Sequence, residues 1–312
     1  MSGLLILFPG QGSQKPGMAE HLWEFPKARE AFAEAGDVLG WDIGELCRHG
    51  TMEDLTRTDR TQLTILACSV ATWRVLEEEG ISFAVAAGHS LGEYSALVAS
   101  GRMTFADSLR VVDVRGRGMQ ACGEQNGGTM AAIIGLDDAA VDEICSSLTQ
   151  VWVANYNSPG QVVISGSEDS IRAAGEQAKE RGAGRVVPLP VSGAFHTPFM
   201  AGAAESLTAA LSGVRFEAGR GKFFSTTELR YPGPEELAQV LAKQLMSPVK
   251  FAQGMTMVLA GEQPDRPSMG LEVGPGNVLS GLMKRIDRDF PAAATADAGS
   301  LQNALEQAGG RR

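Results

Sequence analysis

The stretch ISFAVAAGHSLGEYSALVAS, Ile81 to Ser100, joins an apolar run to a helical pattern through a serine flanked by glycines. Ile81 to Ala87 has the composition of a buried strand, and Leu91 to Ser100 predicts a helix. Between them, Gly88 to Gly92 fits the GxSxG pattern of a nucleophile elbow, which turns a strand sharply into a helix and exposes the serine Oγ. The alternative is that Ser90 only caps the helix N-terminus.

The sequence around this stretch predicts an α/β fold. Leu4 to Phe8 is a second short apolar run, which Pro9 and Gly10 end in a tight loop. A helix with one apolar stripe, from Leu63 to Trp73, lies between the two runs. Further strand patterns near residues 223–226 and 269–273 alternate with helical ones. We therefore expect a large domain that is α/β-hydrolase-like.

The pattern changes after the glycine-rich CGEQNGG segment, residues 122–128. From there the predicted order is βαββαβ, which is the ferredoxin-like motif. The expected strands are residues 130–136, 151–156, 161–166 and 185–191, and the expected helices are residues 138–148 and 168–182. We therefore predict a ferredoxin-like small domain, residues 125–196, inserted into a large domain made of residues 1–124 and 197–312.

Composition and charge exclude several classes of protein. The 312 residues are 44% hydrophobic and carry a net charge of −10, which gives nucleic-acid binding no electrostatic basis. No apolar run approaches the ~18 residues of a membrane span, and the N-terminus lacks the basic region of a secretory signal. Four scattered cysteines without a histidine at ligand spacing indicate reduced thiols and no metal site. We expect a cytoplasmic protein.

A nucleophilic serine needs a base, which is usually a histidine. In elbow enzymes the histidine follows the serine in the chain, and of the four histidines only His196 does so. It follows the last predicted strand of the small domain, so it can lie where the two domains meet. No acidic residue stands out as a third triad member, and a main-chain carbonyl could orient His196 instead. The alternative is a histidine with a purely structural role.

Seven motifs together resemble the malonyl-CoA:acyl carrier protein transacylase family, and their order and approximate spacing agree over nearly the whole chain. They are FPGQGSQ (8–14), GHSLGEY (88–94), VRG (114–116), NSPGQVVISG (157–166), GAFH (193–196), QLMSPVKF (244–251) and EVGPGNVL (272–279).

The resemblance implies roles for eight residues. The acyl group would be carried by Ser90 with His196 as its base, and the backbone amides of Gln11 and Leu91 would form the oxyanion hole. The substrate would be bound by Arg115, on the malonyl carboxylate, with Asn157 shaping the site and Phe195 crowding an α-methyl branch; the main-chain carbonyl of Gln244 would orient His196. Without the resemblance, we would expect Arg115 to be a solvent-facing arginine on a helix. Arg117, two residues further on, could be mistaken for the carboxylate-binding arginine, but the VRG motif favours Arg115.

The resemblance implies transfer of a malonyl group from malonyl-CoA to the phosphopantetheine thiol of acyl carrier protein, in fatty acid biosynthesis. The reaction would be ping-pong through a malonyl-serine, with no metal or redox cofactor. Because acyl carrier proteins are acidic, we expect a basic patch near the mouth of the site, and we expect a monomer. The alternatives are an acyltransferase of polyketide synthesis, a serine thioesterase or hydrolase, and a non-catalytic module that docks acyl carriers.

Overall fold

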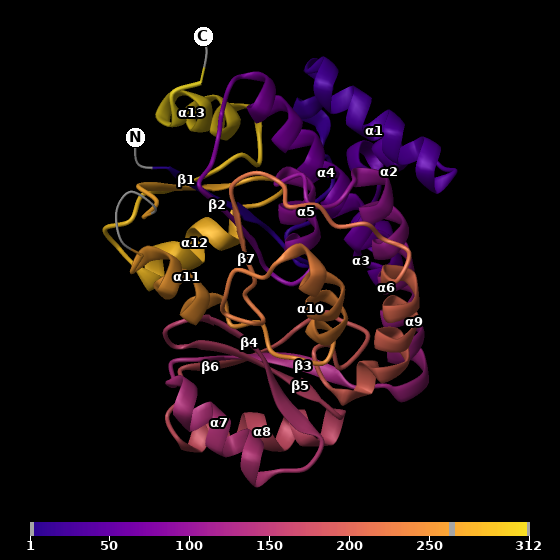
Figure 1. Cartoon of the computed structure of the whole chain (residues 1–312). Coiled ribbons are helices and arrows are strands. Elements are labelled where there is room, and N and C mark those ends of the chain that lie inside the picture. Colours follow the sequence, from indigo (N-terminus) through magenta and orange to yellow (C-terminus); the bar gives the residue numbers. More distant parts are fainter. Residues whose placement is uncertain (1–2, 262–265, 311–312) are drawn as a thin grey trace.

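Five short parallel strands form the larger of two sheets, in the order β7-β2-β1-β8-β9 (Figure 1). They are β1 (Leu4–Phe8), β2 (Val85–Gly88), β7 (Lys222–Phe224), β8 (Met269–Glu272) and β9 (Ala292–Ala294). The structure is a computed structural model that describes residues 3–261 and 266–310. Side chains of β1 alternate between the faces: Ile6 and Phe8 belong to one core cluster, and Leu5 and Leu7 to another.

Helices cover both faces of this sheet (Figure 1). The N-terminal ones are η1 (Glu20–Glu24), α1 (Pro26–Leu39), α2 (Ile43–His49), α3 (Met52–Thr56), α4 (Thr58–Glu78), α5 (Gly92–Ala99) and α6 (Phe105–Asn126). The C-terminal ones are η2 (Pro198–Met200), α9 (Ala201–Leu211), η3 (Pro234–Glu236), α10 (Leu237–Gln244), α11 (Phe251–Leu259), α12 (Val278–Ile286) and α13 (Ala298–Ala308). The core on the face of Ile6 includes residues of α1, α4, α6, α9 and α10, and α11 and α12 pack on the opposite face.

The second sheet is antiparallel, with the order β4-β5-β3-β6. Its elements are β3 (Thr129–Ile134), α7 (Asp138–Ser147), β4 (Val151–Ser158), β5 (Gln161–Gly166), α8 (Glu168–Glu180) and β6 (Arg185–Pro188). This order and connectivity are ferredoxin-like, and α7 and α8 share a core with the sheet. The predicted fold class is confirmed, whereas the domain boundaries at residues 125 and 196 stay a prediction.

The two sheets are joined beside the segment that follows α10. Val249 donates a backbone hydrogen bond to the carbonyl of Ala154 in β4, and its own carbonyl accepts one from Tyr156. The bonds are 2.8 and 2.9 Å long. They fix the edge of the small sheet against the chain two residues beyond Ser247, close to the candidate site.

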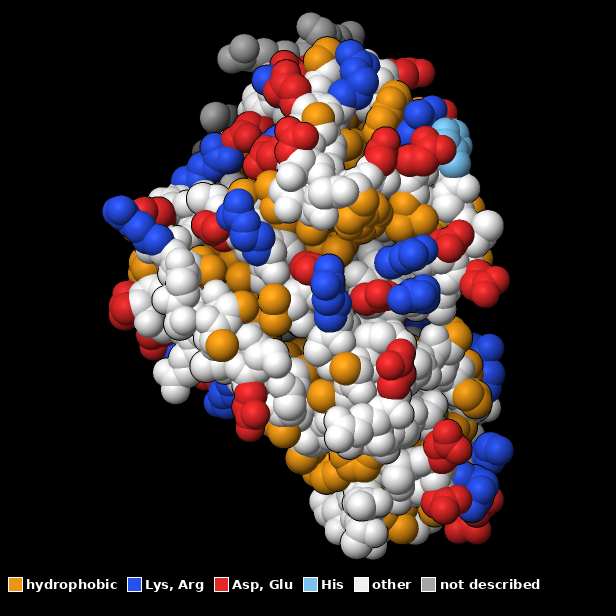
Figure 2. All heavy atoms as spheres, turned by 90° about the vertical axis from the view of Figure 1, so that its right-hand side faces the viewer, with side chains coloured by type: hydrophobic (Ala, Val, Ile, Leu, Met, Phe, Trp, Pro, Cys, Tyr) orange, Lys and Arg blue, Asp and Glu red, His pale blue; other side chains and the backbone are white. Residues whose placement is uncertain are grey.

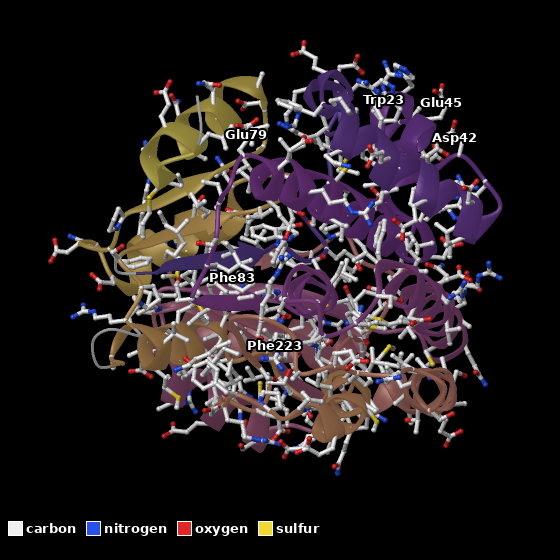
Figure 3. The ribbon with its side chains drawn as sticks, turned by 45° about the horizontal axis from the view of Figure 1, so that its top comes forward. Trp23, Asp42, Glu45, Glu79, Phe83 and Phe223 are labelled. Atoms are coloured by element: carbon white, nitrogen blue, oxygen red, sulfur yellow. The ribbon has the colours of Figure 1, made fainter. Side chains whose placement is uncertain are left out.

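Strand β2 is shorter than predicted, because Val85 to Gly88 are the residues that align with β1. Phe83 precedes the strand and instead packs against Trp73 in an edge-to-face contact, with 5.2 Å between the ring centroids. In Figure 3, Phe83 and Phe223 lie well away from the helical corner that holds Trp23, Asp42 and Glu45. At that corner Asp42 caps α2 by accepting a hydrogen bond from the Glu45 amide, 2.9 Å long.

Within the described residues, no helix is long and apolar enough to cross a membrane. All four cysteines are buried and unpaired. Residues 3–261 and 266–310 also contain no cluster of three His, Cys, Asp or Glu side chains that could hold a metal ion.

Candidate active site

Ser90 lies in the sharp turn between β2 and α5. Its φ of 52° is in the left-handed region, which a non-glycine residue adopts only when its surroundings impose it. The flanking glycines permit the turn: a Cβ on Gly88 would lie 2.0 Å from the carbonyl carbon of Gly92, and a Cβ on Gly92 would lie 1.9 Å from the Phe8 oxygen. The N-cap residue of α5 is Leu91, without a side-chain capping bond. The predicted elbow is therefore present, and Ser90 is not a capping serine.

The loop after β1 runs beside this elbow. Phe8 is paired with Gly88, and its carbonyl accepts a 3.0 Å hydrogen bond from the His89 amide. Gln11 and Leu91 line one cavity of about 90 Å³ together with Ser90 and His196. In the described part of the chain, the backbone amides of Gln11 and Leu91 donate to no other group. Both amides are thus available beside the serine.

His196 lies next to Ser90, with 2.9 Å between its Nε2 and the serine Oγ. Its Nδ1 is 3.0 Å from two carbonyl oxygens, those of Gln244 and Ser247. Because carbonyl oxygens only accept, Nδ1 carries the ring proton and Nε2 presents its lone pair to Ser90. Burial, together with the positive charge of Arg115, lowers the pKa of His196 to about 4. The imidazole is therefore neutral at pH 7 and can accept a proton.

Two main-chain carbonyls therefore stand where a triad would have a carboxylate. The structure places the Gln244 carbonyl where the resemblance implied it. The Ser247 carbonyl was missed, since a backbone acceptor leaves no sequence signal. The side chain of Gln244 adds contacts of its own: its Nε2 donates to the carbonyl of Ser90, at 3.1 Å, and to Glu93 Oε2, at 2.8 Å.

Arg115 is buried, with 1% of its surface exposed, and it reaches the same serine from α6. Its Nη2 donates to Ser90 Oγ at 2.9 Å and to Gln244 Oε1 at 3.2 Å. Its Nη1 donates to Gln62 Oε1 at 2.5 Å. Arg117, by contrast, is exposed and pairs with Asp113 at 2.9 Å. The solvent-facing alternative for Arg115 is therefore wrong, and the two arginines are clearly distinguished.

Glu93 is a buried carboxylate that the sequence analysis missed. It accepts hydrogen bonds from the Thr226 amide, at 2.7 Å, from the Thr226 hydroxyl, at 2.9 Å, and from the Gln244 side chain. Burial raises the pKa of Glu93 to about 7, although these donors oppose the shift. The available signal was a glutamate in the first turn of α5, within the GHSLGEY motif.

Phe195 and Asn157 lie at different depths. Phe195 lines the 90 Å³ cavity with Ser90 and Arg115. Asn157 lines an adjoining cavity of about 440 Å³, and its Oδ1 is 2.8 Å from His89 Nε2. The residues that line both cavities are Gln11, His89, Asn155 and Leu189. The inner space fits a small acyl group next to Ser90, and the outer one fits a longer chain that leads to it.

Comparison with known proteins agrees with this fold. Residues 6–304 match the family model described as acyl transferase domain. The fold and this match define an acyltransferase.

Named relatives make the assignment narrower. The malonyl CoA-acyl carrier protein transacylases of Salmonella typhimurium and Bacillus subtilis are 40% and 38% identical to the chain. Each match covers 98% of this chain, and 100% and 97% of the respective relative.

Solved structures agree over the same length. One is a malonyl-transacylase in complex with a type II PKS acyl-carrier protein, with a TM-score of 0.93, 41% identity, and 98% and 100% of the two chains covered. Another is an acyl carrier protein S-malonyltransferase from Vibrio cholerae, with a TM-score of 0.91, 41% identity, and 97% and 100% covered. The chain belongs to the family of malonyl CoA-acyl carrier protein transacylases.

Proposed function

We propose that this protein transfers the malonyl group of malonyl-CoA to the phosphopantetheine thiol of acyl carrier protein, through a malonyl ester on Ser90. One observation carries the proposal: Ser90 Oγ lies 2.9 Å from a neutral imidazole nitrogen and 2.9 Å from a buried guanidinium. The first group can take the serine proton. The second can bind the distant carboxylate of a malonyl group, which an acetyl group lacks.

In the first half-reaction, Ser90 Oγ attacks the thioester carbonyl while His196 Nε2 takes its proton. The carbonyl oxygen becomes an oxyanion, which the amides of Gln11 and Leu91 stabilise; each such donor contributes ~3 kcal/mol in a protease oxyanion hole. The intermediate collapses, the C–S bond breaks, and CoA leaves as a thiol with the proton from His196. Malonyl-Ser90 and neutral His196 remain.

In the second half-reaction, the carrier's thiol gives its proton to His196 and attacks the ester carbonyl. Collapse breaks the C–O bond, and His196 returns the proton to Ser90 Oγ. The carbonyls of Gln244 and Ser247 keep the imidazole in the same orientation throughout, since both accept from Nδ1. The protein is regenerated without a net change in protons.

Substrate selection follows from the walls of the two cavities. Arg115 would pair with the malonyl carboxylate in the inner cavity, where the ring of Phe195 would crowd an α-methyl branch. Asn157 would shape the outer cavity, through which the pantetheine arm would reach Ser90. We therefore expect malonyl to be preferred over acetyl and methylmalonyl.

The acidic carrier requires a basic surface at the mouth of the outer cavity. Arg285 of α12 lines that cavity and is exposed, and Lys284 is its exposed neighbour. Figure 2 shows a different face, covered by α1, α2, α6 and α9, on which basic and acidic side chains are interspersed. Some of the basic side chains of the helical layer are paired with acidic neighbours, as Arg57 is with Asp59. We therefore propose that the carrier docks at α12, on a monomeric cytoplasmic protein.

Mixing the purified protein with malonyl-CoA and holo acyl carrier protein tests the proposal. The expected product is malonyl carrier protein, in an amount that matches the CoA released. Free malonate as the main product would instead make the protein a hydrolase. The similarity to a PKS complex keeps a polyketide role as the second candidate. Carriers of both pathways are therefore compared, and we expect the fatty-acid carrier to react faster.

A further inference from the structure

Arg115 is a buried cation held by neutral groups. Its acceptors are the side-chain oxygens of Gln62 and Gln244 and the hydroxyl of Ser90. Within residues 3–261 and 266–310, no Asp or Glu forms an ion pair with it. Buried arginines are ordinarily paired with carboxylates, because an uncompensated charge in the interior is costly. None of its hydrogen-bond acceptors is a carboxylate, so the carboxylate of a malonyl group can be its charged partner.

The nearest buried carboxylate is kept at a distance by an amide. Gln244 donates through Nε2 to Glu93 and accepts through Oε1 from Arg115, so it stands between the two charges. Burial lowers the pKa of Arg115, which reflects the cost of holding its charge there. The interaction of Arg115 with Glu93 is thus indirect, and no direct ion pair compensates the guanidinium charge.

Gln62, from α4, is the second uncharged side chain that accepts a hydrogen bond from Arg115, and its orientation is fixed. The side chain is fully buried; its Oε1 faces Arg115 Nη1 and its Nε2 lies 3.2 Å from the sulfur of Met119. A glutamate in the same place would put a negative oxygen against Arg115. Its other oxygen would face the Met119 sulfur, which donates no hydrogen bond.

We infer that Gln62 is a specificity-determining positioning residue: it fixes the Arg115 guanidinium with a neutral acceptor and so reserves the positive charge for the carboxylate of the acyl group. This inference rests on the proposed function. It predicts that the charge of residue 62, and not only its hydrogen bond, sets the preference for acyl groups that carry a carboxylate over those that do not.

Two variants separate charge from hydrogen bonding. Gln62→Glu keeps size and acceptor but neutralises Arg115, whereas Gln62→Met keeps approximate size and the free charge but loses the acceptor. The measurement is kcat/KM for acylation of the protein by malonyl-CoA and by acetyl-CoA. We expect Gln62→Glu to lower the malonyl-to-acetyl ratio roughly 30-fold or more, and Gln62→Met to lower it only about tenfold. In both variants acetyl acylation should stay within about threefold of the parent.

A loss shared equally by both acyl groups, or an unchanged ratio in Gln62→Glu, would overturn the inference. If Gln62→Glu does not fold, Gln62→Met decides, because an unchanged ratio there contradicts the positioning role. In an Arg115→Gln background, Gln62→Met should leave the ratio unchanged, since the guanidinium that Gln62 positions is gone. If the parent protein itself acquires no malonyl group, the proposed function fails rather than this inference.

Discussion

Ser90 Oγ is shared by two side chains with different chemistry. The imidazole of His196 faces this oxygen with its Nε2 and would accept the serine proton, while the guanidinium of Arg115 donates to the same oxygen. A hydrogen bond donated by a cation withdraws electron density from the oxygen and makes it a weaker nucleophile. A malonyl carboxylate that draws Nη2 away would therefore also release the nucleophile. In the proposed mechanism, recognition of the acyl group and activation of the serine would be coupled at this one atom.

Arg115 and Arg117 both lie on α6, two residues apart, and give a matched test at the residue scale. We expect Arg115→Gln to reduce the malonyl-to-acetyl ratio of kcat/KM by roughly 30-fold or more, because the carboxylate loses its charged partner. Arg117→Gln is the control, since Arg117 is exposed and pairs with Asp113 on the same helix. Equal losses with both acyl groups in Arg115→Gln would remove this residue from carboxylate recognition.

The pH dependence of acylation reports on His196. Its lowered pKa, about 4, means that the base stays neutral well below pH 6.5, so acylation by acetyl-CoA should fall only as the pH approaches 4. Arg115 contributes to that lowering, and removal of its charge in Arg115→Gln should move the acid limb to higher pH. The pKa of Glu93 is raised to about 7, so titration of this carboxyl could also change the rate. The variant Glu93→Gln does not titrate, and any change in rate that disappears in this variant belongs to Glu93. An acid limb near 6.5 that persists in Glu93→Gln would contradict the burial of the base.

At the scale of elements, the elbow depends on two glycines that let β1, β2 and α5 meet. We expect Gly92→Ala to destabilise the protein by about 3 kcal/mol, measured by urea unfolding, because the added methyl would overlap the Phe8 carbonyl. Gly213→Ala is the control, since a Cβ there would meet no atom within 4 Å. Similar stabilities for the two variants would contradict the close approach of the elbow to β1.

Elements could be predicted where the pattern is local. The strand expected at residues 161–166 coincides with β5, and the order of elements in the small domain was correctly predicted. The positions of Ser90 and His196 followed from the strand and helix pattern and from chain order. Gln62 and Ser247 could not be found in this way, because they meet Arg115 and His196 only through packing of distant segments. Sequence patterns describe single elements, whereas these contacts depend on where whole helices lie.

At the scale of the whole molecule, the site lies where both sheets meet. Ser90 follows a strand of the parallel sheet and His196 follows the antiparallel one. The bonds of Val249 join β4 to the segment that carries the carbonyl of Ser247. The orientation of the base therefore depends on how the small sheet is held against the large one.

The proposed docking surface at α12 makes a prediction at this scale. Reversing the charge in Arg285→Glu should lower kcat/KM for acyl carrier protein about tenfold, because an acidic partner would then be repelled at the cavity mouth. Arg172→Glu, on an exposed position of α8, is the control for a general change in charge. If kcat/KM for acyl carrier protein is unchanged in Arg285→Glu, the carrier docks elsewhere.

The most direct test of malonyl transfer through Ser90 is the mass of the protein after exposure to malonyl-CoA alone, followed by mapping of the modified peptide. We expect one malonyl group on Ser90, none in Ser90→Ala, and complete discharge when holo acyl carrier protein is added. A malonyl group that persists in Ser90→Ala, or transfer to the carrier without any acylated protein, would contradict this mechanism.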